Sequence, residues 1–171
     1  MAGDKYLYDN SGVLTEKAAI QASAGAGDAG KVPALDATGK LDTTMMPVGI
    51  GAETDSIATS QTLVAGDFVN IWDSTGLKVR KADASVAGKE AHGFVLAAHT
   101  HPTTAVVYRP SQSNNQKTGM TIGAMQFLSV TFPGGTQEIC PTGTGQAIQK
   151  LGIALSATQM TFAPQEHIIL L

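Results

Sequence analysis

The stretch that decides the fold is residues 63–72, which read LVAGDFVNIW. A turn signal at Gly66-Asp67 separates a short apolar pair from a run rich in β-branched and aromatic residues that ends at Trp72. Short runs of this kind, bounded by Gly, Pro, Asp or Ser, are typical of β-strands. Similar runs occupy residues 77–82, 92–98, 104–108, 117–122, 126–131, 136–139, 147–155, 159–162 and 166–171. No stretch beyond Ser60 has a convincing helical period, so we predict an all-β body folded as a compact β-barrel or sandwich.

The β-rich part of the chain repeats itself weakly. Residues 63–71 align with residues 120–128, MTIGAMQFL, at a shift of 57 residues. Residues 93–98, GFVLAA, align with residues 152–157, GIALSA, at a shift of 59. Each set of strands is too small to hide its apolar face alone, so pairing the two sets closes one core. We therefore predict an internal pseudo-repeat, about 61–110 and 118–171, with the turn-like segment 110–116 as an exposed loop between the halves.

The chain before the body has a different character. Its apolar side chains occur at isolated positions, which is typical of an extended arm that lies on another surface. We predict one short helix within it, residues 15–24, because Thr15 can act as a cap and Glu16 suits the first turn. The predicted division is an N-terminal arm, residues 1–55, followed by the β-rich body, residues 56–171. The predicted partner-binding residues of the arm are Val32, Leu35, Leu41, Met45 and Met46.

Composition excludes several classes of protein. The formal net charge is −3 and no long block of Lys or Arg occurs, so we expect no nucleic-acid partner. No apolar run approaches the roughly 20 residues that cross a bilayer, so we expect no membrane partner. The first ten residues lack the pattern of a secretory signal, and we expect synthesis in a cytosol. The single cysteine, Cys140, excludes a disulfide framework within the chain.

Motifs that would carry chemistry are incomplete. Residues 25–31, GAGDAGK, match part of a phosphate-binding loop, but Val32-Pro33 follow where Ser or Thr and a helix are required. His99 and His101 would share one face of a strand, but no Cys, Asp or Glu lies close by in the sequence, so a symmetry axis in an oligomer is the main way to complete a metal site there. No Gly-x-Ser-x-Gly elbow and no acid partner for a histidine are evident. We therefore predict a protein that is not an enzyme and has no cofactor and no metal.

Two stretches together resemble the bacteriophage head decoration, or capsid cement, proteins. The first is residues 30–42, GKVPALDATGKLD, followed by residues 45–49, MMPVG. The second runs from Ala65-Gly66-Asp67 through residues 79–83 to residues 91–95, and resumes at residues 153–156. The resemblance implies a β-tulip or β-barrel body with an N-terminal arm. It also implies trimers, or sometimes dimers, that sit outside the capsid and bridge neighbouring major capsid subunits.

The expectation that follows is a structural virion protein, assembled in the host cytoplasm and located on the capsid exterior. Its partners would be the major capsid protein and copies of itself, as a homotrimer or a dimer. A second interpretation is a phage head fibre or tail-associated structural protein, because the phrase in residues 30–42 also resembles phage fibre proteins. A third, of another class, is a small-molecule-binding or enzymatic β domain.

Overall fold

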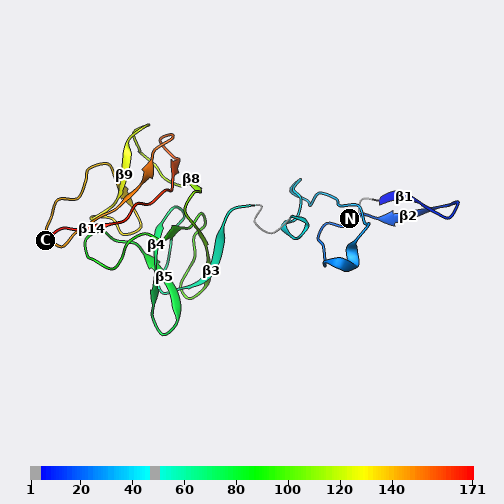
Figure 1. Ribbon diagram of the computed structural model, residues 1–171, viewed down its shortest axis with the longest axis horizontal. Helices are drawn as coiled ribbons and strands as arrows, with labels where there is room; N and C mark the ends of the chain where they lie inside the picture. The colour runs from blue at the N-terminus through cyan, green and yellow to red at the C-terminus, as the bar shows by residue number, and fades with distance from the viewer. Residues whose placement is uncertain (1–4, 47–50) are drawn as a thin grey trace. The chain divides into compact units, whose positions relative to one another are not determined.

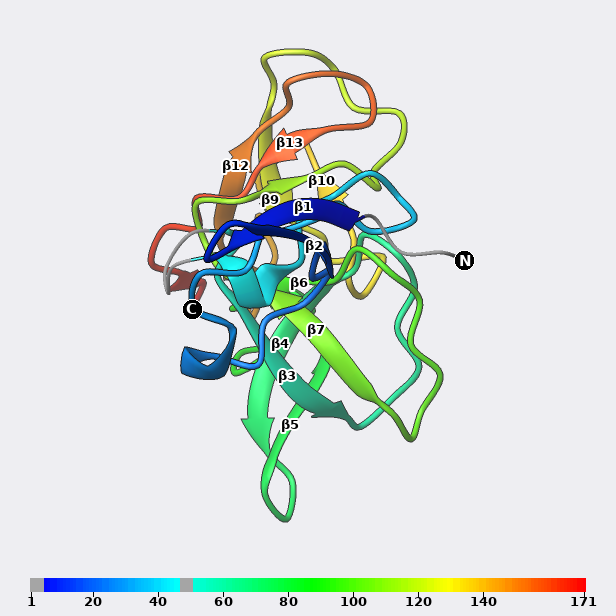
Figure 2. The same cartoon turned by 90° about the vertical axis from the view of Figure 1, so that its right-hand side faces the viewer.

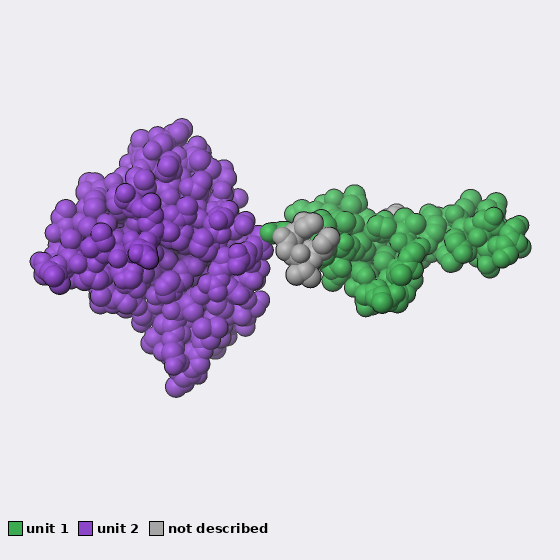
Figure 3. All heavy atoms as spheres, viewed as in Figure 1, with its two compact units in different colours: residues 1–51 green, residues 52–171 purple. Residues whose placement is uncertain are grey.

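The computed structural model describes residues 5–46 and 51–171, and divides the chain into two compact units (Figures 1 and 3). We call residues 1–51 the N-terminal unit and residues 52–171 the body. The sequence analysis placed this boundary between residues 55 and 56. The body begins earlier because strand β3, Thr54–Thr59, already pairs with a later strand of the body from its first residue.

The first half of the body is built on five strands. These are β3 (Thr54–Thr59), β4 (Phe68–Asp73), β5 (Leu77–Lys81), β6 (Gly93–Phe94) and β7 (Thr104–Tyr108). Their pairings close on themselves in the order β3-β5-β4-β6-β7 (Figure 2). Strand β3 pairs in parallel with β5 and antiparallel with β7. Inside the ring lies a buried apolar cluster of Ile57, Leu63, Val69, Val79, Val95, Ala105 and Val107.

The second half of the body consists of smaller sheets. Strands β9 (Met125–Leu128), β10 (Thr136–Gln137) and β12 (Lys150–Ile153) form a sheet in the order β10-β9-β12. Two further antiparallel pairs join β8 (Ser113–Asn114) to β13 (Met160–Thr161), and β11 (Ala147–Ile148) to β14 (Ile168–Ile169). The all-β class is therefore confirmed. One barrel for the whole body is not found, because these strands are too short to wrap a common core and form separate sheets.

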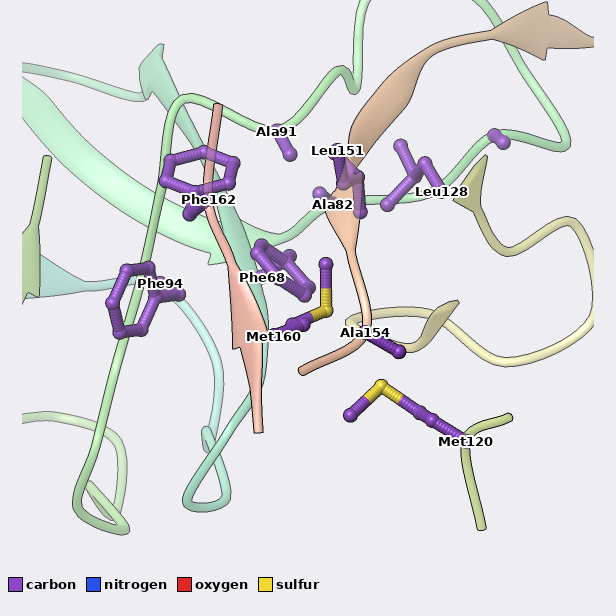
Figure 4. Close-up of a cluster of buried hydrophobic side chains, with 11 residues drawn as sticks. Phe68, Ala82, Ala91, Phe94, Met120, Leu128, Leu151, Ala154, Met160 and Phe162 are labelled. Carbon is purple, nitrogen blue, oxygen red and sulfur yellow. The ribbon is translucent and has the colours of Figure 1, made fainter. Parts of the chain in front are cut away.

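An aromatic cluster joins the two halves. The Phe162 ring, from the end of the chain, lies 5.2 Å from the Phe68 ring and 5.6 Å from the Phe94 ring, measured between centroids. All three side chains are fully buried, and Met160, Leu128 and Leu151 belong to the same buried cluster (Figure 4). Aromatic pairs at such distances and tilted angles are favourable beyond the area that they bury. The main core of the body is therefore an interface between its two halves.

The two hairpins at the centre of the halves have the same register. Strand β4 pairs with β5, and β9 pairs with β10. The pairs of the first hairpin recur in the second at a shift of 57 residues: Asn70↔Arg80 and Ile71↔Val79 correspond to Phe127↔Gln137 and Leu128↔Thr136. This shift is the one that aligns the two stretches of sequence.

The third strand of each half also occupies the same place. Strand β6 pairs with β4, and β12 pairs with β9, on the side away from the hairpin partner. The pairs Phe68↔Phe94 and Val69↔Gly93 correspond to Met125↔Ile153 and Gln126↔Gly152, at shifts of 57 and 59 residues. One turn hydrogen bond recurs as well: Gly66 N donates to Val95 O, and Gly123 N donates to Ala154 O, both at 2.8 Å.

The segment between the halves differs from its prediction. Residues 110–116 were expected to be an exposed loop, and most of them are exposed. Asn114, however, is fully buried in strand β8, and its Nδ2 donates to Gly66 O over 3.0 Å. A buried amide must find hydrogen-bond partners, and this one ties the segment to the start of β4.

The N-terminal unit contains a hairpin where a helix was predicted. Strands β1 (Lys5–Asn10) and β2 (Val13–Ala18) pair antiparallel, so the predicted helix over residues 15–24 is wrong. The turn between them has positive φ at Ser11 (57°) and Gly12 (90°), which is the geometry that matches strand twist in tight hairpins. Two 3₁₀ helices follow, η1 (Ala26–Asp28) and η2 (Thr43–Met45).

The repeated turn offers a matched test of the body's packing. A Cβ at Gly66, where φ is +87°, would lie 2.6 Å from the Gln116 carbonyl oxygen. The corresponding Gly123 has φ +80° and open space around it. We expect Gly123→Ala to lower the free energy of unfolding by about 1 kcal/mol from backbone strain alone, and Gly66→Ala by roughly 3 kcal/mol because the contact adds to it. Urea denaturation measures both, and equal losses would contradict the close approach.

Candidate partner-binding surfaces

The N-terminal unit has no core of its own in the part of the chain that the structure describes. Among residues 5–46, every side chain is exposed or half-buried. Its backbone is nevertheless ordered by local hydrogen bonds, such as Ile20 N to Val32 O at 3.0 Å and Ala34 N to Ile20 O at 2.7 Å. Ordering backbone costs about 1–2 kcal/mol per residue, which burial normally offsets. This unit therefore lacks the usual source of stability for a folded domain.

The hairpin β1–β2 presents apolar side chains on both of its faces. Alternation along the paired strands places Leu7 and Leu14 on one face, and Tyr8 and Val13 on the other. Leu7 and Leu14 are 72% and 71% exposed. The polar contacts of the hairpin are local: Lys5 pairs with Glu16, and Lys17 Nζ lies 3.6 Å from the Tyr8 ring centroid. An isolated two-stranded hairpin is marginally stable in water, so its two apolar faces favour a partner surface.

The five predicted partner-binding residues lie in the N-terminal unit after the hairpin. Val32, Leu35 and Met46 are exposed, whereas Leu41 and Met45 are half-buried. Met45 ends η2, which Asp42 caps through Thr44 N at 2.9 Å. The structure thus places these residues at an accessible surface, and none of them is enclosed in a core.

Four of the body's exposed apolar residues lie at the paired ends of β9 and β12 or within three residues of them. We call Ile122, Met125, Ile153 and Leu155 the outer patch; all four are exposed. Met125 pairs with Ile153 across β9 and β12, and the hydrogen bonds of Ala154 to Gly123 and Ala124 hold Ile122 and Leu155 close to them. A hollow of about 160 Å³ adjoins Met125 and Ile153. In the first half, the corresponding Phe68 and Phe94 are fully buried by the second half.

A charged hollow of about 380 Å³ lies where the two halves meet. The buried Asp67 carboxylate accepts from Val64 N at 2.8 Å and pairs with Lys81 Nζ at 3.0 Å. Lys117 Nζ donates to Gly134 O at 3.1 Å and lies 4.7 Å from the Phe68 ring centroid. Desolvation lowers the pKa of the Lys117 ammonium to about 8; Asp67 opposes this lowering and Lys81 adds to it.

Two side chains of the candidate chemical motifs are engaged by other groups of the protein. Lys31, at the end of the partial phosphate-binding loop, pairs with Asp28 at 2.6 Å. His101 Nδ1 lies 2.9 Å from Thr59 O. Across residues 5–46 and 51–171, no three His, Cys, Asp or Glu side chains gather as metal ligands. Nor does any helix in these ranges have the length and apolar character needed to cross a membrane.

Sequence reasoning missed the hairpin, the charged hollow and an acid partner for a histidine: His167 Nε2 lies 3.3 Å from Glu90 Oε1. Residues 5–18 carried a signal for the hairpin, because apolar runs flank Asn10-Ser11-Gly12. The hollow carried none, because Lys117 is far in the sequence from Asp67 and Lys81, which the β4–β5 hairpin brings together, and it reaches them only through the packing of the two halves.

Comparison with known proteins found no match for this chain among protein-family models, curated proteins or solved structures. The interpretation of the surfaces therefore depends on their geometry and on the residues themselves.

The lowered pKa of Lys117 predicts a dependence of stability on pH. Between pH 8 and about 10.4, the folded state binds fewer protons at this amine than the unfolded state does, so the free energy of unfolding rises with pH. Lys117→Met should remove this rise, which amounts to at most about 3 kcal/mol. Lys150→Met, at an exposed lysine of β12, should keep it. Urea denaturation at pH 7 to 10 makes the comparison, and parallel curves for both variants would contradict it.

Proposed function

We propose that this protein is a structural virion protein that binds the outside of a phage capsid and bridges neighbouring major capsid subunits. The observation that carries the proposal is the N-terminal unit, in which residues 5–46 have ordered backbone but no buried side chain. Such a segment gains little by folding on itself. A large docking surface offsets the cost of ordering it, and the repeated lattice of a capsid provides one at every site.

The proposed contacts are apolar and backbone-mediated. The hairpin offers Leu7, Leu14 and Val13, and the following segment offers Val32 and Leu35, all exposed. The acidic and basic side chains nearby are largely engaged with each other or with backbone groups, as in the pairs Lys5–Glu16 and Lys31–Asp28. We therefore expect salt to weaken attachment only modestly.

Binding of undecorated shells tests this function. Purified protein is added to shells that lack it, and bound copies are counted after sedimentation. The double variant Leu7→Asp, Leu14→Asp should reduce binding at least tenfold, because it places charge on one apolar face of the hairpin. Leu77→Asp, at a 65% exposed leucine of the body, is the matched control and should bind like the native protein. Native protein that fails to bind shells, or a double variant that binds normally, would overturn the proposal.

We also propose that the body self-associates through the outer patch, as a homotrimer, with a dimer as the alternative. Closed symmetric assemblies are the common form of soluble homo-oligomers. The support is the unequal burial of corresponding residues within the body: Phe68 and Phe94 are fully buried against the second half, whereas Met125 and Ile153 are 36% and 44% exposed. The recurrence of strand order and register further supports a body derived from two related units.

Light scattering coupled to gel filtration tests the self-association. The double variant Ile122→Asp, Leu155→Asp should shift the protein to a monomer, because both side chains lie in the outer patch and point to solvent. Leu77→Asp should leave the mass of the oligomer unchanged. A native protein that is monomeric at all concentrations would contradict the proposal.

A further inference from the structure

The charged hollow lies beside the start of β4, where the segment before the second half crosses the loop between β9 and β10. Its walls include Val64, Asp67, Lys81, Lys117, Phe132 and Gly134. Its volume of about 380 Å³ exceeds that of a single amino-acid side chain, and it opens to solvent. It is distinct from the hairpin and from the outer patch.

The Lys117 ammonium has more donors than partners. It carries three N–H groups, and one donates to the Gly134 carbonyl. No ion pair to Lys117 forms within the described residues. Asp67, whose charge opposes the lowering of the Lys117 pKa, is engaged by Lys81 and by Val64 N. A desolvated cation without a paired anion is unfavourable, and it attracts any anion that can reach it.

The side chains around the hollow carry a net positive charge that one bound anion would balance. Lys81 and Lys117 contribute two positive charges and Asp67 contributes one negative charge, so the sum at neutral pH is +1. The remaining wall is mixed: Gln116, Thr118 and Thr136 are polar, whereas Val64 and Phe132 are apolar. Phe132 is 70% exposed and Val64 is also exposed, so both are available to a ligand.

We propose that this hollow binds a carboxylate attached to a short apolar group, with Lys117 and Lys81 holding the carboxylate and Phe132 and Val64 contacting the apolar part. The natural source that this chemistry fits is a Glu or Asp side chain of a protein partner, next to an apolar residue. Charge-assisted hydrogen bonds to an ammonium are short and strong, and they gain strength in a site withdrawn from water. Only this choice of source rests on the proposed function; the site itself does not.

Butyrate is the probe, and butyramide is its neutral isostere. Each is titrated into the full-length protein and followed by two-dimensional NMR. We expect saturable butyrate shifts at Val64, Lys81, Lys117 and Phe132, with affinity at least tenfold higher than for butyramide. Affinity should fall as pH rises through about 8, because Lys117 then loses its proton and with it the charge that attracts the carboxylate. Equal affinity for butyrate and butyramide would overturn the site.

Lys117→Met tests the role of the ammonium, because methionine keeps most of the apolar stem and removes the charge. We expect at least a tenfold loss of butyrate affinity, with Lys150→Met as the unaffected control. If Lys117→Met does not fold, Lys81→Met replaces it and should weaken butyrate severalfold. A folded Lys117 or Lys81 variant with native affinity contradicts the proposal.

Shell binding separates the two proposals. If the protein binds butyrate but not shells, the carboxylate site is supported and the decoration function is refuted. If the protein binds shells but shows no preference for butyrate over butyramide, the decoration function is supported and the carboxylate site is refuted.

Discussion

The contact of Phe162 with Phe68 and Phe94 is the interaction on which the body depends. Phe68 and Phe94 belong to the first half, and their partner comes from the last ten residues of the chain. Without it, the first half would expose two phenylalanines and the short sheets of the second half would have nothing to cover. Large-to-small changes of buried aromatic residues typically cost about 3–5 kcal/mol, which is a substantial part of a domain's stability. The ring of strands and the second half are therefore mutually dependent.

The hairpins of the two halves have the same register, but the corresponding faces of the two sheets are buried to different extents. In the first half, the face that carries Phe68 and Phe94 became the internal interface. In the second half, the corresponding face carries the smaller Met125 and Ile153 and remains at the surface. Because the second half covers this face of the first half, its own corresponding face is left more exposed. This geometry explains why a small body with a well-packed core still presents an apolar patch.

The sequence was sufficient for the fold class and for the matching positions of the repeat, because both depend on short-range alternation and on Gly66 and Gly123 at equivalent turns. It was insufficient for closure of the sheets, since the pairing of β3 with both β5 and β7 depends on contacts between distant strands. The helix over residues 15–24 was wrong because Thr15 and Glu16 suit a helix start locally, whereas the Ser11-Gly12 turn brings β2 onto β1. The charged hollow could not be predicted from the sequence, because Lys117 comes close to Asp67 only when the two halves pack together.

The order of these contacts along the chain has a consequence for synthesis. Strand β3 finds its partner β7 only after residue 108 has been made, and the aromatic cluster waits for Phe162. Contacts between residues so far apart form slowly, because the loop between them must be closed first. The N-terminal unit, with its exposed leucines, therefore leaves the ribosome well before the body can fold. During synthesis, each chain therefore passes through an interval in which the exposed Leu7, Val13 and Leu14 are present before the body has folded.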